Sequence, residues 1–461
     1  MENLNKDYCF YESTTSLCNI CENTVPAKII IKNGSVYILK YCPIHGEHEE
    51  LLEEDCNYHF KKRLYDKPGT KMKIHTNVNK GCPHDCGTCP QHNQHACMGL
   101  IEITEDCNIS CPTCYAKAGN KKHLSLDKIE KMMDFLQDSE YNNAEILQIS
   151  GGEPTIHPNI IEILQMAKAK KFKYIVINTN GIRIAEDEEF VKKLSQFNKA
   201  FELYMQFDSL NDKATESLRG EKLVSIKKRA LENIAKYKIP TTLVATMSTD
   251  VNDNEIGSLF VYALNQPYVR GINFQTISFF GRNSSIDTKN RLTISGVLKK
   301  LEQQTNKMIK MDDFIPLPCN VEKVAITYMY RSNNGNFIPI TRDAKIHEYL
   351  PIINNTFAFT IEDALKNAGK SLLDLKTSCE CFKFINDFKQ MIPLNFFLKS
   401  KEDKSEYVSN NTFRVSVTSF IDKYNFDTKS LQKECVHVIT EDLKKIPFSA
   451  YNTIYRNKKT N

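Results

Sequence analysis

The sequence predicts an α/β protein, a partial (β/α)6 TIM-like barrel preceded by a Cys-rich N-terminal metal module and followed by a C-terminal α+β domain. Two observations lead to this prediction. Six short apolar runs alternate with amphipathic stretches of helical period, a pattern that favours parallel βα units. The 16 cysteines are gathered mostly near the N-terminus, and residues 115–318 contain none, so the region with the βα pattern is free of them.

Each apolar run is expected to be one strand of the barrel. The runs are residues 100–104, 146–150, 174–178, 202–207, 242–247 and 272–277. The stretches 125–139 and 159–172 have the apolar spacing of helices that would cross between strands. Polar and glycine-containing turns follow the strands, as in "SGGEPT", "NTNG" and "QFDS". Because chemistry in parallel barrels gathers at the carboxyl ends of the strands, these turns are candidate site segments.

Cysteine spacing and the βα pattern together divide the chain into four parts. We expect a mononuclear metal module, rubredoxin-like or zinc, at 1–75 and an auxiliary iron–sulfur segment at 76–98. The core barrel should span 99–305, and 306–461 should form a domain that covers the substrate.

Composition places the protein in an ordinary globular class, with 41% hydrophobic and 25% charged residues. The near balance of 61 basic and 56 acidic residues argues against nucleic-acid binding. The N-terminus has no apolar leader, and no run approaches the ~20 apolar residues of a membrane helix. We therefore expect a cytoplasmic protein, whose thiols stay reduced and whose clustered cysteines bind metal.

The most informative motif is "CNISCPTC", with Cys107, Cys111 and Cys114 directly after the first expected strand. A structural zinc ion takes four ligands, and a [4Fe–4S] cube contains four irons, usually with four thiolates. Three thiols in one tight loop would leave one iron open to a small molecule. The alternative is a zinc loop whose fourth ligand lies elsewhere.

Two further groups of cysteines precede this loop. Four thiols, Cys82, Cys86, Cys89 and Cys97, have the spacing C-x3-C-x2-C-x7-C and would saturate an auxiliary [4Fe–4S] cube that relays electrons or braces the fold. A zinc knot is the alternative.

The N-terminal group has the spacing C-x2-C…C-x2-H and predicts one tetrahedral zinc or rubredoxin-like iron. Its expected ligands are Cys18, Cys21, Cys42 and His45. Cys56 is an alternative fourth ligand, and unliganded core cysteines are the blander interpretation.

Four sparse cysteines follow later in the chain: Cys319, Cys379, Cys381 and Cys435. They either hold a third cluster or remain buried free thiols.

The cysteine triplet and the turn "GGEP" one βα unit later together resemble the radical S-adenosylmethionine superfamily. In that superfamily three cysteines hold a [4Fe–4S] cluster whose open iron chelates S-adenosylmethionine, and reductive cleavage gives a 5′-deoxyadenosyl radical. The resemblance implies that Cys107, Cys111 and Cys114 are the cluster ligands. It implies cofactor contacts for Tyr115, Gly151, Gly152, Glu153, Asn178, Asn180, Gln206 and Asp208.

Each cofactor contact has an expected role. Glu153 would help to hold the methionyl amine, and the two glycines would let the backbone approach the ligand. Gln206 and Asp208 would lie near the ribose, although strand-end capping also explains Gln206 and Asn180. The residue before the third cysteine is often aromatic in the superfamily but is Thr113 here, so Tyr115 is expected to cover the adenine instead.

Segments along nearly the whole chain resemble one subfamily, which includes archaeal tetraether lipid synthase and proteins described as 7,8-dihydro-6-hydroxymethylpterin dimethyltransferases. They include "GCPHDCGTCPQHNQHACMGLIEITEDCNISCPTC", "LRG" at 218–220, "DFIPLPC" at 313–319 and "IPFSAYN" at 446–452. The chain departs from this resemblance at Glu434 and Ser449, where thiols are expected.

Three functions remain open from the sequence. The main hypothesis is hydrogen abstraction from an unactivated carbon, for C–C bond formation on a lipid chain. Apolar stretches at 357–361 and 391–398 could line a lipid groove, and a lipid substrate would bring peripheral membrane contact.

The alternative is radical methylation of a pterin or another small molecule, for which Arg219 of "LRG" is a candidate contact. Either enzyme would need a reducing partner such as ferredoxin or flavodoxin. The third hypothesis is a zinc-rich binding protein without catalytic activity.

Overall fold

In the computed structural model, the described residues are 6–116, 118–283, 291–332, 334–350, 355–357, 400, 403, 407–408 and 410–456. The stretch 391–398, residues 358–361, and both Cys379 and Cys381 lie outside them. Among the described residues, no helix combines the length and the apolar character that a membrane crossing requires.

Six parallel strands form the centre of the fold, and each overlaps one expected apolar run. They are β5 (Met98–Thr104), β6 (Ile146–Gly151), β7 (Tyr174–Thr179), β8 (Phe201–Gln206), β9 (Thr241–Met247) and β10 (Val269–Thr276). They pair in chain order from β5 to β10. The predicted partial barrel is therefore confirmed.

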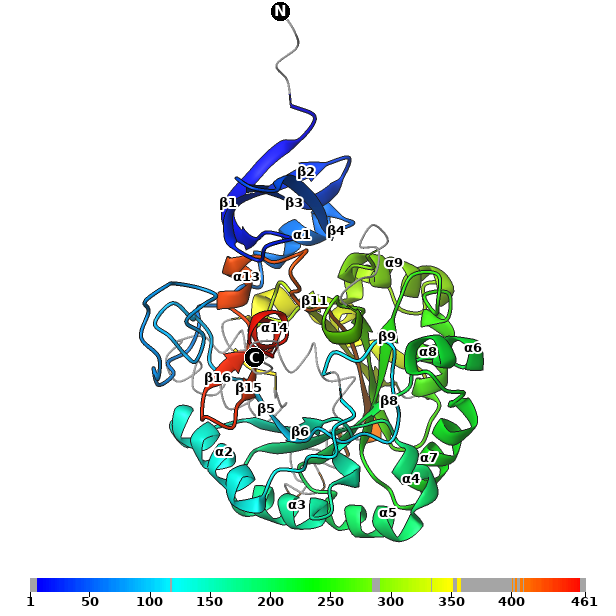
Figure 1. The fold of residues 1–461 in the computed structure, drawn as a ribbon. Coiled ribbons are helices and arrows are strands. Elements are labelled where there is room, and N and C mark those ends of the chain that lie inside the picture. Colours follow the sequence, from blue (N-terminus) through cyan, green and yellow to red (C-terminus); the bar gives the residue numbers. More distant parts are fainter. Residues whose placement is uncertain are drawn as a thin grey trace, which may run out of the picture.

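Helices cover the outer face of this curved sheet, as Figure 1 shows. The longer helices are α2 (Leu126–Ser139), α3 (Ile160–Ala169), α7 (Val224–Lys236), α8 (Ile256–Leu264) and α9 (Ile294–Gln304). Shorter ones are α4 (Ile182–Glu186), α5 (Glu188–Leu194) and α6 (Asp212–Arg219). Ser125 caps α2 by accepting a hydrogen bond from the Lys128 amide, which sets the start of the first crossover.

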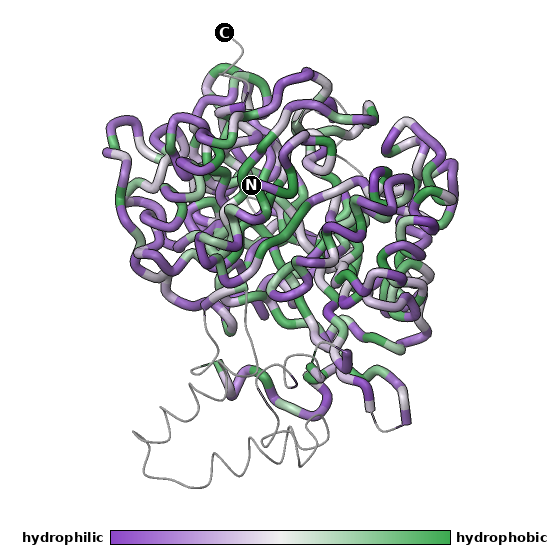
Figure 2. Tube along the Cα trace, turned by 90° about the horizontal axis from the view of Figure 1, so that it is seen from below, coloured by the Kyte–Doolittle hydropathy of each residue, from purple (hydrophilic) through white to green (hydrophobic). Residues whose placement is uncertain are grey.

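The main core lies between the strands and these helices. Alternate strand residues such as Leu147, Ile149, Leu203 and Met205 are fully buried in it. In Figure 2 hydrophobic segments gather in the middle of the molecule, whereas hydrophilic segments follow the outer helices and loops. Because side chains alternate along a strand, the residues between these apolar positions face the inside of the barrel.

The C-terminal region adds strands to the same sheet, an arrangement that the sequence did not predict. After β10 come β14 (Thr412–Thr418), which is parallel to it, then β12 (Val324–Arg331) and the short β11 (Ile315–Pro316) and β13 (Phe337–Pro339). At the other end, β15 (Val436–Ile439) pairs with β5 and is followed by β16 (Lys445–Pro447). The sheet therefore crosses the boundary predicted at residue 306.

The N-terminal module is a separate four-stranded antiparallel sheet. Its strands are β1 (Cys9–Leu17), β2 (Thr24–Lys32), β3 (Ser35–Cys42) and β4 (Gly46–Glu53), and α1 (Cys56–Lys62) follows them. The module lies beside α13 (Thr428–Gln432), where Thr15 Oγ1 donates to Thr428 Oγ1 at 2.7 Å (Figure 1). Its attachment thus depends on the C-terminal region.

Candidate functional site

The loop that carries Cys107, Cys111 and Cys114 follows β5 at the carboxyl end of the barrel. The three thiols share one apolar cluster with Ile109, Ile182 and Leu223. Burial raises the pKa of Cys107 to about 12. A thiolate at this position therefore needs a positive partner such as a metal centre. The structure brings the predicted triplet together.

Gly151 and Gly152 pack directly on the start of the cysteine loop. A Cβ on Gly151 would lie 2.3 Å from the Thr104 carbonyl oxygen, and one on Gly152 would lie 2.0 Å from that of Asp106. The Gly152 amide donates to Thr104 O and the Glu153 amide to Asp106 O, each at 2.8 Å. The two glycines therefore allow the two loops to contact each other closely. From the sequence we expected them to allow the backbone to approach the ligand.

Glu153 lies beneath this turn, with a side chain that is almost fully buried. Its Oε1 accepts hydrogen bonds from Thr155 Oγ1 at 2.6 Å and Thr179 Oγ1 at 2.8 Å, and Oε2 accepts one from the Asn180 amide at 2.6 Å. Burial nevertheless raises the pKa of the carboxyl group. Glu153 thus ties the end of β6 to the end of β7.

Asn180 connects β7 to the cysteine loop. Its Nδ2 donates to Asn108 Oδ1 at 2.7 Å, while its Oδ1 accepts from the Ile182 amide at 3.0 Å. The second bond is the capping role that the sequence left open. The predicted residue Asn178, two positions earlier, is half-buried on β7.

Arg219 is buried beside the loop. It donates two hydrogen bonds to Asp208, from Nε at 2.8 Å and from Nη2 at 2.7 Å. The Asp208 carboxylate also accepts from the Thr246 amide at 2.9 Å, so both of its oxygens are engaged inside the protein. Burial raises the pKa of the Cys111 thiol, whereas the positive charge of Arg219 lowers it. Arg219 therefore favours the thiolate form of Cys111.

The rest of "LRG" also holds the cysteine loop. Thr113 Oγ1 donates to the Leu218 carbonyl at 2.9 Å, and a Cβ on Gly220, whose φ is +81°, would lie 3.2 Å from Ser110 O. The motif was noted in the sequence, but its position against the cysteines depends on the fold.

A second arginine, which no pattern in the sequence indicated, supports the loop from the segment after β10. The Arg282 amide donates to Cys114 O at 3.0 Å, and Arg282 Nη1 donates to Cys111 O at 3.1 Å. A Cβ on Gly281 would lie 2.4 Å from the same Cys114 oxygen. The buried Arg219 and the exposed Arg282 therefore both lie against a loop that would carry anionic thiolates, a donor set that fits an iron–sulfur cluster.

Tyr115, predicted to cover an adenine, packs towards the C-terminal segment. Its ring contacts Phe448 edge-on, with centroids 5.4 Å apart, and Arg456 lies 5.7 Å from it. Arg456 also pairs with Glu102 on β5 at 2.5 Å. The segment from Phe448 to Arg456 thus reaches the mouth of the barrel.

Polar side chains line the inside of the barrel. Asn273 Nδ2 donates to Tyr204 OH, while Asn273 Oδ1 accepts from Ser416 Oγ at 2.9 Å and Thr418 Oγ1 at 3.0 Å. Gln206 Oε1 is buried and has no hydrogen-bond partner among the described residues. Because a buried, unpaired oxygen is costly, this atom fits a position that a bound ligand would satisfy.

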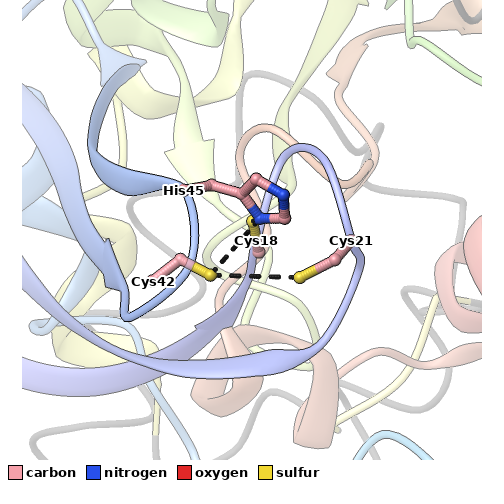
Figure 3. A group of neighbouring side chains, drawn as sticks. All are labelled: Cys18, Cys21, Cys42 and His45. Atoms are coloured by element: carbon pink, nitrogen blue, oxygen red, sulfur yellow. Dashed lines mark hydrogen bonds between the residues drawn. The ribbon is translucent and has the colours of Figure 1, made fainter.

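The N-terminal ligands converge as predicted. Figure 3 shows Cys18, Cys21, Cys42 and His45 pointing toward one another from two loops of the module. Their ligand atoms all lie within 4.8 Å, with His45 Nδ1 3.5 Å from both Cys18 Sγ and Cys42 Sγ. Such a spacing fits the four ligands of one tetrahedral ion. Cys56 is not in this set.

In the structure, the four cysteines predicted to hold the auxiliary cluster lie in two groups. Cys82, Cys86 and Cys89 line one small cavity with His92, next to β16. Cys97 instead joins Cys319 and Cys435, with all three thiols within 4.8 Å of one another. Cys97 directly precedes β5, so its position is set by the sheet and not by its spacing from Cys89.

The two departures from the expected thiols occur together. Ser449 Oγ donates to Glu434 Oε1 at 2.8 Å, and both side chains are buried. Burial raises the pKa of Glu434 to about 7. A hydrogen-bonded pair thus occupies the two positions at which the family resemblance led us to expect thiols.

Residues 101–263 match the model for the radical SAM superfamily, and residues 10–54 match the HMPTM N-terminal zinc ribbon domain. The chain is 32% identical to a 7,8-dihydro-6-hydroxymethylpterin dimethyltransferase of Methanocaldococcus jannaschii, over 97% of this chain and 94% of that protein. It is 26% identical to a GTP 3′,8-cyclase of Alkaliphilus oremlandii, over 60% and 87%.

Solved structures show lower similarity. Streptococcus suis SuiB bound to S-adenosylmethionine is 17% identical, with a TM-score of 0.38 over 47% of this chain and 48% of that one. A radical SAM methyltransferase from Sphaerobacter thermophilus is 10% identical, with a TM-score of 0.33 over 65% and 74%.

Proposed function

Because this chain belongs to the radical S-adenosylmethionine superfamily and is an iron–sulfur enzyme of methyltransferase type, we propose that it methylates a small polar heterocycle, such as a pterin, by radical chemistry. The observation that carries the proposal is the polar inner face of the barrel, with Tyr204, Asn273 and Gln206 directed inward. A pterin ring presents amide-like donors and acceptors that such side chains can pair.

The main sequence hypothesis, C–C bond formation on a lipid chain, is less well supported. A lipid chain would leave the buried Gln206 Oε1 unpaired, at a cost of about 1–3 kcal/mol. The relative that covers nearly the whole chain is described as acting on a pterin. We therefore prefer the second hypothesis, in which the enzyme makes no lipid contact.

We assign the cofactor sites as follows. Cys107, Cys111 and Cys114 would hold a [4Fe–4S] cluster, with S-adenosylmethionine at its open iron. When bound, this pair supplies the electron and the radical that abstracts hydrogen. Arg219 and Arg282 hold the loop and balance its negative charge, and Gln206 is placed to bind the ligand inside the barrel.

The remaining centres would serve the catalytic one. Cys82, Cys86 and Cys89 would hold a second cluster, and the N-terminal module would hold zinc or iron. The apolar cluster that contains Cys86 also includes Phe448 and Tyr115, the residue directly after Cys114. This contact provides a short path for electrons that a ferredoxin or flavodoxin donor would deliver.

Anaerobic reconstitution with S-adenosylmethionine and dithionite tests the proposal. We expect 5′-deoxyadenosine and a methylated pterin by mass spectrometry, using methyl-deuterated S-adenosylmethionine to trace the transferred group. Formation of coupled lipid products with no pterin product would overturn the substrate assignment.

Variants sharpen this test. Gln206→Leu and Asn273→Leu should raise KM for the pterin, whereas Gln303→Leu on the exposed face of α9 should not change it. An unchanged KM in both inner-face variants would remove the barrel interior as the substrate site.

A further inference from the structure

The auxiliary cysteines lie close to the surface of the molecule. Cys82 is half-buried, whereas Cys86 and Cys89 are buried. The segment 66–97 that carries them forms the blue loops beside α13 and β16, at the edge of the molecule (Figure 1). A cluster bound to these cysteines would therefore lie near solvent, within reach of an external electron donor.

A chain of contacts joins the auxiliary cysteines to the catalytic loop. Tyr455 OH accepts a hydrogen bond from the Cys86 amide at 2.9 Å. The guanidinium group of the next residue, Arg456, lies 5.7 Å from the centre of the Tyr115 ring, and Tyr115 directly follows Cys114. Electrons that enter at the auxiliary cysteines would thus have a route through packed side chains to the catalytic thiols.

A surface hollow lies next to the auxiliary cysteines. It has a volume of about 500 Å³, and it shares His92 with the small cavity that the auxiliary cysteines line. Its other lining residues, most of them exposed, are Pro68, Gly69, Thr70, Lys71, Asn93 and Lys433. The hollow therefore places lysine side chains beside the cysteine cavity.

The same segment carries positive charge that is not neutralised locally. Lys71 and Lys80 are exposed, and neither pairs with a carboxylate among the described residues. The only acidic residues of the segment are Asp66 and Asp85. Asp66 pairs with Lys433 at 2.5 Å, and Asp85 accepts hydrogen bonds from backbone amides of its own loop. The charges of Lys71 and Lys80 are therefore available to a partner.

Two apolar side chains lie exposed between these lysines in the sequence. Ile74 is 57% exposed and Val78 is 39% exposed. The His75 amide donates to Thr88 O at 3.1 Å, which holds this part of the segment against the loop of the auxiliary cysteines. Apolar side chains with charged neighbours are the usual composition of a protein–protein interface, and electron-transfer complexes are among the smallest.

We propose that Lys71, Ile74, Val78 and Lys80, next to the auxiliary cysteines, form the docking surface for a small acidic electron-transfer protein of the flavodoxin or ferredoxin class. Carboxylates of the donor would pair with the two lysines, and complementary charge would steer the encounter. The reduced donor would lose one electron to the cluster held by the auxiliary cysteines. This inference rests on the function proposed above, which places a cluster there.

Binding of a purified bacterial flavodoxin to the full-length, reconstituted protein tests the surface. By calorimetry, Lys71→Glu with Lys80→Glu should raise Kd about tenfold, and added salt should weaken wild-type binding, because exposed charges are screened. The matched control, Lys193→Glu with Lys228→Glu, reverses two exposed lysines of α5 and α7, on the opposite side of the barrel from the blue loops (Figure 1). The control should keep the wild-type Kd. An equal Kd in the two double variants would overturn the proposal.

Formation of 5′-deoxyadenosine separates docking from chemistry. At a limiting concentration of reduced flavodoxin, Lys71→Glu with Lys80→Glu should form 5′-deoxyadenosine about tenfold more slowly than the wild type. Dithionite is a small reductant that needs no protein interface, so it should support both proteins equally. An equal loss with dithionite would refute a docking role for the lysines. Absence of methylated pterin with dithionite would contradict only the substrate assignment, because neither measurement here depends on the pterin.

Carbodiimide cross-linking needs no variant and therefore holds even if the double variant does not fold. The reagent joins amines to carboxylates that touch them, so the wild-type protein mixed with flavodoxin should yield flavodoxin peptides linked to Lys71 or Lys80. Links confined to other lysines would refute the assigned surface. Displacement of flavodoxin by an RNA oligonucleotide would also refute it, because the face would then bind polyanions in general.

Discussion

The N-terminal module and the catalytic loop both gather sulfur ligands, but they do so by different means. Cys18, Cys21, Cys42 and His45 come from two loops of one small sheet and already lie at the spacing of one ion. Cys107, Cys111 and Cys114 come from a single loop that is held by Arg219, Gly152 and Arg282 from three other parts of the barrel. A site with all four ligands can be built within one small sheet. A loop that supplies only three ligands is instead held in place by residues from other parts of the barrel.

Removing the catalytic thiols should have the largest effect. The triple change of Cys107, Cys111 and Cys114 to alanine should remove one cube and abolish 5′-deoxyadenosine formation. The protein should still fold, because the main core of the barrel is a separate cluster from the one that contains these cysteines. Iron content, circular dichroism and product analysis check this, and 5′-deoxyadenosine above background would refute the assignment.

Arg219 should be next, because it supports the loop from a buried position. Arg219→Ala leaves Asp208 buried without its partner, which should cost about 3–5 kcal/mol of stability and sharply lower cofactor cleavage. Arg219→Lys keeps the charge but loses the paired hydrogen bonds to Asp208. This variant should therefore recover only part of the stability and part of the cofactor cleavage. Arg229→Ala, which breaks an exposed pair with Glu186, is the control and should change little. Equal stability and equal rates of cofactor cleavage in Arg219→Ala and Arg229→Ala would show that the loop does not need Arg219.

Gly152→Ala tests the contact between the two loops. The new methyl group would meet the backbone of Asp106, which cannot move as a side chain could, so we expect a loss of about 1–3 kcal/mol and slower cofactor cleavage. Gly335→Ala introduces strain at φ +82° without any close contact and should lower stability alone. Cofactor cleavage at the wild-type rate in Gly152→Ala would mean that the loop tolerates displacement.

The N-terminal module should matter for stability and not for cofactor binding. Cys18→Ser with Cys21→Ser should release one metal ion and lower the melting temperature of the module, because structural metal sites contribute folding energy directly. Binding of S-adenosylmethionine at the catalytic loop should remain. Loss of that binding in a protein shown to be folded would contradict the separation of the two sites.

The smallest effect is expected from His59, which lies buried between the module and the barrel. Burial lowers its pKa to about 4, below the 6.5 of an ordinary histidine. The unfolded chain therefore binds a proton between pH 6.5 and 4 that the folded chain excludes, and stability falls as the pH falls through this range. His59→Gln should reduce this slope by roughly 1 kcal/mol per pH unit near pH 5.5. Identical acid unfolding of the two proteins would show that His59 is protonated when folded.

The sequence by itself determined the six central strands and the cysteines of the catalytic loop. Apolar runs that alternate with helical stretches indicate buried strands. The spacing C-x3-C-x2-C places three thiols in one loop, whatever surrounds that loop. The ligands of the N-terminal module were predictable for the same reason, because each pair lies within a short turn. These features depend on contacts between residues that are near in the chain.

The tertiary structure alone decided where Cys97 belongs, which groups hold the catalytic loop, and how the barrel ends. Cys97 is only eight positions after Cys89, yet it meets Cys319 and Cys435 because β5 pairs with β15. Arg282 reaches Cys111 across a sequence separation of 171 residues. Sheet pairing and crossover helices set such contacts, and spacing along one chain carries no information about them, because a strand's partner is chosen by packing of the whole sheet.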